Sequence, residues 1–212
     1  MTRIRVLKTV LFVTALVPAA HLAAGIVTDD LGANPIEYIT HETGWFALAF
    51  LFLSLTVTPV RRATGWHVLV RFRRMLGLFA FFYASLHLLT WFVFDHTLDV
   101  MGMLEDVVER PFITVGMTAF LIMVPLALTS NAAMIRRLGR RWQTLHRLVY
   151  VAAIAGVVHF WWLVKADVRE PQRWALGLTV LLGVRAWRIV GAWPSQSRRT
   201  ATDEPAGRTA EL

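Results

Sequence analysis

Two histidines, His87 and His159, each lie about midway along a separate run of roughly 20 apolar residues, the length of a membrane span. A polar side chain at that depth is costly unless a partner satisfies it, so an intramembrane histidine indicates a functional site by default. Two such histidines at matching depth favour a single ligand held between them. The natural ligand is a haem iron, because neutral imidazole binds iron well and a flat apolar macrocycle fits between packed helices.

The composition is that of a membrane protein. Of the 212 residues 56% are apolar, the mean hydropathy is +0.53, and the charged residues form short clusters between long apolar runs. The net charge of +8 does not indicate a nucleic-acid partner, because the basic residues flank the apolar runs instead of following one continuous face. The sequence has no cysteine, which excludes disulfides, thiol catalysis and iron–sulfur clusters. Any redox chemistry would therefore need a bound cofactor.

Six apolar runs are long enough to cross a hydrocarbon core of about 30 Å. They predict an all-α membrane protein, a six-transmembrane-helix bundle with spans at residues 8–27, 44–60, 75–95, 111–130, 146–165 and 173–191. The first span is expected to be retained, since Ala23-Ala24-Gly25 is a weak match to a signal-peptide cleavage site. Residues 1–193 would form one domain, and residues 194–212 a disordered cytoplasmic tail. No internal repeat and no Gly-rich phosphate loop is apparent.

The basic residues indicate the orientation of the bundle. With the N-terminus in the cytoplasm, 18 of the 22 Lys and Arg residues lie on the cytoplasmic side, as the positive-inside rule requires. The other four share the outer side with most of the acidic residues. The sequence therefore predicts that both termini are cytoplasmic.

The depths of His87 and His159 can be compared along their helices. His87 follows Arg74 by 13 residues and His159 follows Arg147 by 12, so both lie about 18 to 20 Å from the inner surface by helical rise. Because the third and fifth spans run in the same direction, both imidazoles are expected at one level, in the outer half of the membrane. There they would be the axial ligands of one haem. Taken alone, either histidine could instead hydrogen-bond a Ser, Thr or carbonyl of a neighbouring helix.

His146 lies at the inner boundary, 13 residues before His159. This spacing is about 20 Å of rise, which suits a second haem, but at 100° per residue the two side chains are about 140° apart around the helix axis. A bend, which Gly156 could provide, would be needed to bring them to one face. His146 is predicted to be an iron ligand or a residue of an inner cofactor site, the alternative being an interfacial residue.

The remaining histidines have simpler interpretations. His67 and His96 are expected to be solvated at the surface. His21 is expected to hydrogen-bond a neighbouring helix. The sequence assigns no role to His41.

Several strings resemble the ferric-reductase-like transmembrane family. Arg-Arg-Met-Leu-Gly-Leu at 73–78 precedes the Leu-His pair at 86–87, and Trp-Gln-Thr-Leu-His-Arg-Leu-Val-Tyr at 142–150 precedes the Val-His pair at 158–159. The six-span length without a dehydrogenase domain, with the strings at 32–35 and 41–44, resembles one branch of this family. That branch comprises the haem-binding membrane subunits of a bacterial system that repairs periplasmic methionine sulfoxide. The resemblance extends from about Lys8 to Trp193.

The resemblance implies a cofactor and partners. It implies one or two haem b groups bound through His87 and His159, with His146 as a further cofactor-binding and metal-ligand candidate, and FMN is associated with the family. Electrons would pass from the quinone pool or a cytoplasmic flavin reductase to a soluble periplasmic molybdenum-cofactor methionine sulfoxide reductase. The chain would be a multi-pass protein of the bacterial inner membrane. With no cysteine and no large outer loop, it would relay electrons and not itself reduce the sulfoxide.

Two other functions stay open from the sequence. One is a non-redox membrane protein, such as a small transporter or an assembly factor, whose histidines are structural or conduct protons. The other is a self-contained ferric or quinone oxidoreductase.

Overall fold

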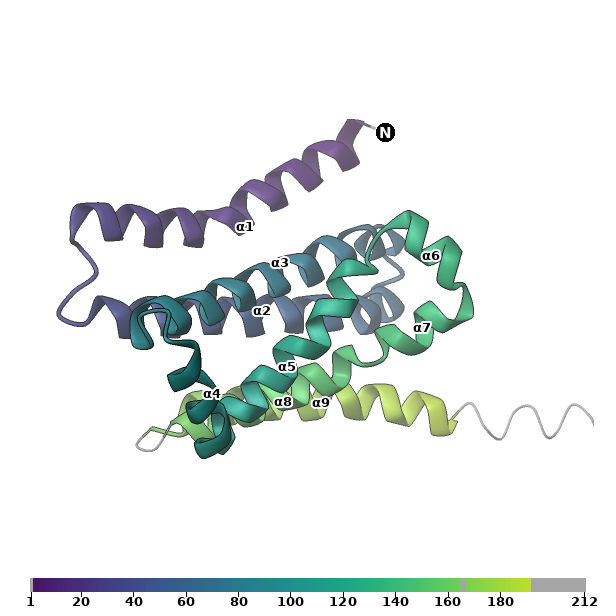
Figure 1. Cartoon of the computed structure of the whole chain (residues 1–212). Helices are drawn as coiled ribbons and strands as arrows, with labels where there is room; N and C mark the ends of the chain where they lie inside the picture. The colour runs from purple at the N-terminus through teal and green to yellow at the C-terminus, as the bar shows by residue number, and fades with distance from the viewer. Residues whose placement is uncertain (1, 165–166, 192–212) are drawn as a thin grey trace, which may run out of the picture.

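The computed structural model describes residues 2–164 and 167–191, and within these ranges all regular elements are helical. The prediction of an all-α protein is confirmed for this part of the chain, whereas the predicted tail, 194–212, lies outside it. Figure 1 shows the elements, which are α1 (Thr2–Thr28), α2 (Pro35–Thr64), η1 (His67–Leu69), α3 (Val70–Thr90), η2 (Trp91–Asp95), α4 (Val100–Glu109), α5 (Pro111–Leu128), α6 (Ala132–Leu138), α7 (Arg140–His146), α8 (Val149–Leu163) and α9 (Arg169–Gly191).

Five helical segments of the described chain are long and apolar enough to cross a membrane, and the protein is a multi-pass membrane protein. They match the first five predicted spans and comprise Arg3–Thr28, Pro35–Thr64, His67–Asp95, Pro111–Leu128 and Arg140–Leu163. The predicted sixth span, 173–191, is helical as part of α9, but α9 is not among these five. The first two turns of α9 carry the charged residues Arg169, Glu170 and Arg173.

Helices α2 and α3 form the first of two tightly packed pairs. The side chain of Asn34 caps α2 by accepting the Glu37 N–H, and Pro35 fits the first turn, where its missing donor costs nothing. The helix ends at Gly65, whose φ of 74° suits glycine. Because α2 begins nine residues before the predicted span at 44, it presents an additional helical segment, residues 35–43, to α3.

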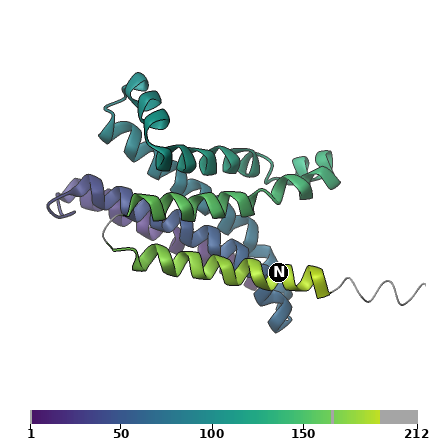
Figure 2. The ribbon, with the colours of Figure 1, turned by 90° about the horizontal axis from the view of Figure 1, so that it is seen from below.

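Helices α5 and α8 form the second pair, and α9 packs on α8 and α2. Figure 2 shows α5, α8 and α9 side by side. The face of α8 toward the bundle carries Ala152 and Ala153, which are 1% and 0% exposed. Small residues such as these let two helix backbones approach closely, which is how helices associate in membranes without a large hydrophobic driving force.

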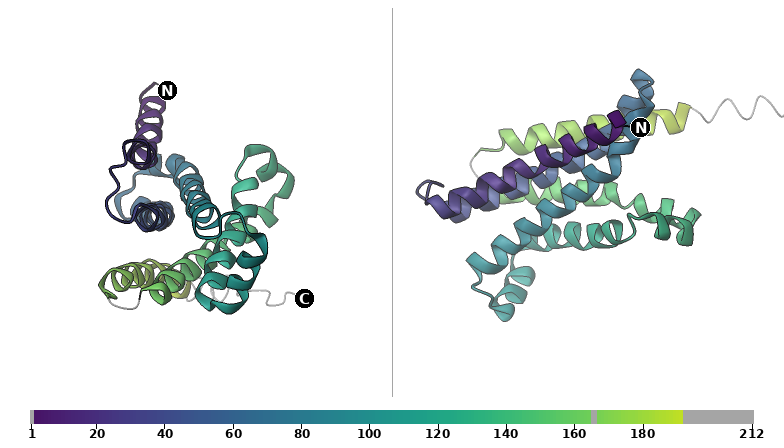
Figure 3. Two further views of the ribbon diagram at one scale, coloured as in Figure 1. Left: turned by 60° about the vertical axis from the view of Figure 1, so that its left-hand side comes forward. Right: turned by 90° about the horizontal axis from the view of Figure 1, so that it is seen from above.

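Helix α1 lies at the edge of the bundle beside α2 and α3 (Figure 3). Pro18 lacks the N–H that would continue the hydrogen-bond ladder of α1. At this point the buried Tyr83 hydroxyl of α3 donates to the Ala15 carbonyl at 2.7 Å and accepts the Ala19 N–H at 3.2 Å. One hydroxyl thus satisfies both backbone groups and ties α1 to the first pair.

The two ends of the bundle differ in charge. The start of α1, the end of α2, the helices α6 and α7 and the last part of α9 lie at one end, as Figure 1 shows. This arginine-rich end, as we name it, carries the clusters Arg61–Arg62, Arg136–Arg137 and Arg140–Arg141. The opposite end carries α4 and the start of α9, and with them most acidic side chains of the described chain.

Candidate functional site

His87 and His159 come together between the two helix pairs. His87 is on α3 and His159 is on α8, and their ring centroids are 6.1 Å apart with the planes at 78°. The structure therefore places both imidazoles at one level of the bundle, as their equal depth in the sequence predicts.

Each ring is held by a backbone carbonyl of the partner helix in its own pair. His87 Nδ1 lies 2.9 Å from the Thr40 carbonyl oxygen on α2, and His159 Nδ1 lies 2.7 Å from that of Phe112 on α5. A carbonyl oxygen only accepts hydrogen bonds, so Nδ1 is the donor in both rings. In a neutral imidazole this leaves the Nε2 lone pair free, which is the tautomer that a metal ligand needs.

Two glycines make room for the rings. Gly44 and Gly116 lie four residues after the two carbonyl residues, on the same helix face. A Cβ on Gly44 would lie 3.2 Å from His87 Nδ1, and a Cβ on Gly116 would lie 2.7 Å from His159 Nδ1. Each imidazole thus occupies the space that a side chain would fill. The sequence alone predicts no role for either glycine.

We call the backbone carbonyl and the glycine that hold each ring its seat: Thr40 and Gly44 for His87, and Phe112 and Gly116 for His159. The two seats have the same arrangement. Gly116 follows Gly44 by 72 residues, and His159 follows His87 by the same interval. Each hydrogen bond between ring and carbonyl also spans 47 residues. The two helix pairs therefore hold their histidines in the same way, although no internal repeat is apparent in the sequence. The equal spacing of the two Gly–His combinations was the available signal, but it becomes meaningful only once the pairing of helices is known.

The donor set suits a haem iron and does not suit a bare metal ion. The described residues contain no group of three or more His, Cys, Asp or Glu side chains that could hold a metal, whereas a bare ion usually takes at least three protein ligands. A haem provides its own in-plane nitrogens and needs only two axial ligands. Metal–nitrogen bonds of about 2 Å and imidazole ring radii of about 1.1 Å put such ring centres about 6 Å apart, close to the observed separation.

A buried hydroxyl beside the pair is also without a partner. Thr40 Oγ1 is buried and makes no hydrogen bond among the described residues, although the carbonyl of the same residue holds His87. Buried polar groups are normally satisfied, so this hydroxyl indicates a polar group of a ligand nearby. The carboxylates at the edge of a haem would provide one.

His146 lies apart from this pair and is held differently. Its Nε2 is 3.0 Å from Thr129 Oγ1, and that hydroxyl donates its hydrogen to the Pro125 carbonyl at 2.6 Å. His146 Nε2 is therefore the donor to Thr129, so its tautomer is the opposite of that in the other two rings. Trp142 stacks on the imidazole at 4.0 Å and donates its Nε1–H to the Thr129 carbonyl. Together these contacts fix α7 to the end of α5.

The bend that a second haem on the same face would need is not at Gly156, but the chain does break between His146 and His159. The helix breaks at residues 147–148, between α7 and α8, where the N–H groups of Arg147, Leu148 and Tyr150 bond three residues back instead of four. A 3₁₀ turn rotates about 120° per residue, so three such residues add about 60° and reduce the offset from about 140° to about 80°. The break moves His146 toward the face of His159 without aligning the two.

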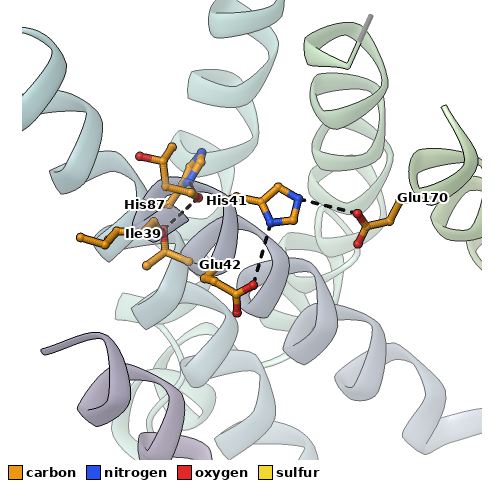
Figure 4. A network of polar contacts seen from close by, with 7 residues as sticks. Ile39, His41, Glu42, His87 and Glu170 are labelled. Carbon is orange, nitrogen blue, oxygen red and sulfur yellow. Dashed lines mark hydrogen bonds and ion pairs between the residues drawn. The ribbon is translucent and has the colours of Figure 1, made fainter. Parts of the chain in front are cut away.

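His41 lies at the surface one residue after Thr40. It is half exposed, with Nε2 3.6 Å from Glu170 Oε2 on α9 and Nδ1 4.0 Å from Glu42 Oε1. Figure 4 shows His41 between these two carboxylates, with His87 nearby. The seat of His87 therefore lies directly beneath a polar surface cluster.

The other histidines only partly follow the sequence expectations. His96 is not solvated: its Nε2 lies 3.0 Å from Asp106 Oδ2 with only 14% of the side chain exposed, and Asp106 also pairs with Arg110. This network attaches α4, which the sequence did not predict, to the end of α3. His67 is exposed, as expected. His21 is exposed as well and makes no hydrogen bond in the described chain, so the expected bond to a neighbouring helix is wrong.

Comparisons with known proteins identify the family. Residues 43–157 match the protein family described as Ferric reductase like transmembrane component. The chain is 50% identical over 202 residues to the protein-methionine-sulfoxide reductase heme-binding subunit MsrQ of Herminiimonas arsenicoxydans, covering 94% of this chain and 91% of the relative. It is 53% identical over 199 residues to MsrQ of Azospira oryzae, covering 90% and 84%. The chain belongs to the MsrQ family.

A further MsrQ relative, from Xanthomonas oryzae pv. oryzae, is 45% identical over 219 residues and is covered along 98% of both chains. The printed names describe these relatives as heme-binding subunits of a protein-methionine-sulfoxide reductase. The resemblance inferred from the sequence strings is thus confirmed at the level of the MsrQ family. No solved structure matches the chain.

Proposed function

We propose that this protein is the haem b membrane electron-transfer subunit of a protein-methionine-sulfoxide reductase system, with His87 and His159 as the axial ligands. The observation that carries the proposal is the geometry of the two rings: their centroids are 6.1 Å apart and both keep Nε2 free. The names of the MsrQ relatives support the same cofactor class. A bound haem supplies one-electron redox chemistry at its iron.

The protein residues orient the two imidazole rings and keep substrate away from the metal. The carbonyls of Thr40 and Phe112 keep the ring protons on Nδ1, and the two glycines let each ring lie against the neighbouring backbone. His87 and His159 would hold the haem iron from both sides, which would leave no position at the metal for a substrate. This arrangement suits electron transfer and leaves sulfoxide reduction to a partner subunit.

The charges at the two ends support the orientation of the bundle in the membrane. The positive-inside rule assigns the arginine-rich end to the cytoplasm, which places the histidine pair in the outer half of the membrane. Six spans with both termini cytoplasmic would then require α9 to be the sixth, and its 23 residues are long enough at about 1.5 Å per residue. The proposed donors are the quinone pool or a cytoplasmic flavin reductase, with FMN as a possible inner cofactor. The proposed acceptor is a periplasmic molybdenum-dependent methionine sulfoxide reductase.

His146 is proposed to serve the inner half of this path, as the ligand of a second haem or as a residue beside an inner cofactor. Its depth, at the start of the fifth span and 13 residues before His159, supports this role. Its bond to Thr129 would have to break before Nε2 could bind iron. We therefore separate the two sites: the outer pair is ready to bind iron, and His146 needs a rearrangement.

Two alternatives fit the geometry less well. A proton-conducting transporter needs a chain of exchangeable groups, but both Nδ1 atoms end on backbone carbonyls. A self-contained ferric or quinone oxidoreductase needs a position for substrate at the cofactor, which two axial histidines would close.

An absorption spectrum of the purified protein tests the proposal. Dithionite should produce the sharp reduced bands of a six-coordinate haem b, and the ratio of haem to protein distinguishes one site from two. A purified, folded protein without haem after expression with sufficient iron and haem supply would rule the proposed function out.

A further inference from the structure

A narrow crevice opens among α2, α8 and α9, away from the histidine pair. Its enclosed part is small, about 20 Å³, and the rest opens to the surroundings; its polar lining residues are Thr58, Arg62, Tyr150 and Arg185. They lie toward the ends of α2 and α9 and near the start of α8, and these helix ends point toward the arginine-rich end in Figure 1.

The lining changes from apolar to basic in the same direction on two of these helices. Along α2 it passes from Leu55 to Arg62, and along α9 from Leu181 to Arg185, so both arginines lie nearer the end of the bundle than both leucines. Tyr150, near the start of α8, lies at the same level as the basic part. The crevice is therefore lined by polar residues at its mouth and by apolar residues deeper in the bundle. A phospholipid in a membrane has its polar and apolar groups in the same order.

The polar mouth has unsatisfied binding capacity. The Arg185 guanidinium stacks over the Tyr150 ring at 4.6 Å, and the Tyr150 hydroxyl is buried without a hydrogen-bond partner in the described chain. No ion pair within the described residues involves Arg62 or Arg185. Arg73 donates to Thr58 Oγ1 at 3.4 Å and brings a third guanidinium to the wall. Guanidinium groups and a hydroxyl donor are the partners that a phosphate oxygen prefers.

We propose that the polar mouth of this crevice binds the phosphate headgroup of an anionic phospholipid, with an acyl chain on the exposed side of α9 along Val180 and Val184. The shared chemistry is a phosphate ester, which a soluble phosphate or a phosphate-bearing cofactor could also present. The exposed apolar side chains Val180 and Val184 favour the lipid, because an acyl chain would cover them and a free phosphate would not. Basic pockets between spans on the cytoplasmic side bind acidic headgroups by the same physics. The inference does not depend on haem binding by the histidine pair.

Native mass spectrometry of the full chain in detergent tests the proposal with phosphatidylglycerol as the probe and phosphatidylcholine as the neutral comparison. Each basic residue near a headgroup contributes about a five-fold change in affinity. Arg185→Gln and Arg62→Gln should therefore each weaken phosphatidylglycerol binding about five-fold, and Tyr150→Phe should weaken it by a smaller factor. Arg136→Gln is the matched control, because it removes one charge from an exposed position of α6 at the same end. This control should change the affinity for phosphatidylglycerol by less than about two-fold, because Arg136 lies outside the crevice.

Three results would overturn the proposal. Equal losses for Arg136→Gln and Arg185→Gln would mean that the lipid responds only to the overall charge of this end. Equal binding of phosphatidylcholine would remove the anionic specificity. Displacement of the lipid by millimolar inorganic phosphate would show that the crevice takes free phosphate instead. Running the titration on His87→Ala protein separates this test from the haem proposal, since lipid binding should be unchanged there.

Discussion

The histidine pair His87–His159 and the single His146 are prepared for metal binding to different degrees. In the pair, both Nδ1 atoms donate to carbonyls and both Nε2 atoms are free, whereas the Nε2 of His146 donates to Thr129. The pair is also seated against glycine, but His146 is stacked under Trp142. An intramembrane histidine is therefore not a metal ligand by position alone. The hydrogen bond at one ring nitrogen determines whether the other, Nε2, is free to bind the metal.

The two seats within the pair differ as well. The His159 ring lies closer to Gly116 than the His87 ring does to Gly44. A Cβ added to Gly116 would lie 2.7 Å from His159 Nδ1, whereas one added to Gly44 would lie 3.2 Å from His87 Nδ1. The seat formed by α5 and α8 therefore tolerates less change than the one formed by α2 and α3.

The largest effect is expected from removing a ligand of the pair. His87→Ala and His159→Ala should each abolish the low-spin reduced spectrum, because one imidazole cannot keep an iron six-coordinate. Optical spectra of dithionite-treated membranes measure this. His41→Ala is the control, since His41 is a neighbouring surface histidine and should leave the spectrum intact. Reduced spectra that remain unchanged in both ligand variants would show that the pair is not the haem site.

A smaller, graded effect is expected from filling the seats. Gly116→Ala should lower haem occupancy more than Gly44→Ala, because a Cβ at 2.7 Å forces the ring away from its carbonyl while one at 3.2 Å needs a shift of a few tenths of an ångström. Losing such a supporting contact typically costs about 10- to 100-fold in metal affinity. Haem titration of the purified variants, with the midpoint potential as a second readout, measures the difference.

The control for these variants is Gly77→Ala on α3, where a Cβ would meet only Ser54 Oγ at an ordinary 3.6 Å. Alanine favours a helix over glycine by about 1 kcal/mol, so none of the three changes should weaken its helix intrinsically. Equal haem loss in all three variants would attribute the effect to general helix packing and not to the seats.

The smallest effect on the outer site is expected at His146. His146→Ala and Thr129→Val should leave the outer haem bound and reducible by dithionite, because neither residue contacts the pair. His146→Ala should nevertheless block haem reduction by the physiological donor in membranes. Thr129→Val frees Nε2 and should retain donor-driven reduction. Loss of all haem in His146→Ala would make His146 a ligand of the same site, and normal donor-driven reduction would make it an interfacial residue only.

The sequence predicted that His87 and His159 lie at one depth, but not the groups that hold their rings. The apolar runs and helical rise placed His87 and His159 at one level, because both quantities depend only on position along a straight helix. The carbonyls of Thr40 and Phe112 and the two glycines act through the pairing of α2 with α3 and of α5 with α8. That pairing is a tertiary property that one helix's pattern does not specify.

The wrong predictions have a similar cause. His96 falls just beyond the apolar run, so it was expected in solvent, but α4 folds back and supplies Asp106. The break at residues 147–148 lies in a string with good helix formers and no proline, and it arises where α7 is fixed to the end of α5 through Thr129. In both places the deciding partner is distant in the sequence or belongs to an element with a weak signal of its own.

Electron paramagnetic resonance of the oxidised purified protein tests the central claim most directly. Two axial imidazoles make ferric haem low-spin, and planes crossed at 78° leave two iron d orbitals nearly equal in energy. We therefore predict that the wild-type protein gives a low-spin signal of large anisotropy and that this signal disappears in His87→Ala and in His159→Ala protein. A high-spin signal in the wild type, or a low-spin signal that survives both substitutions, would contradict it.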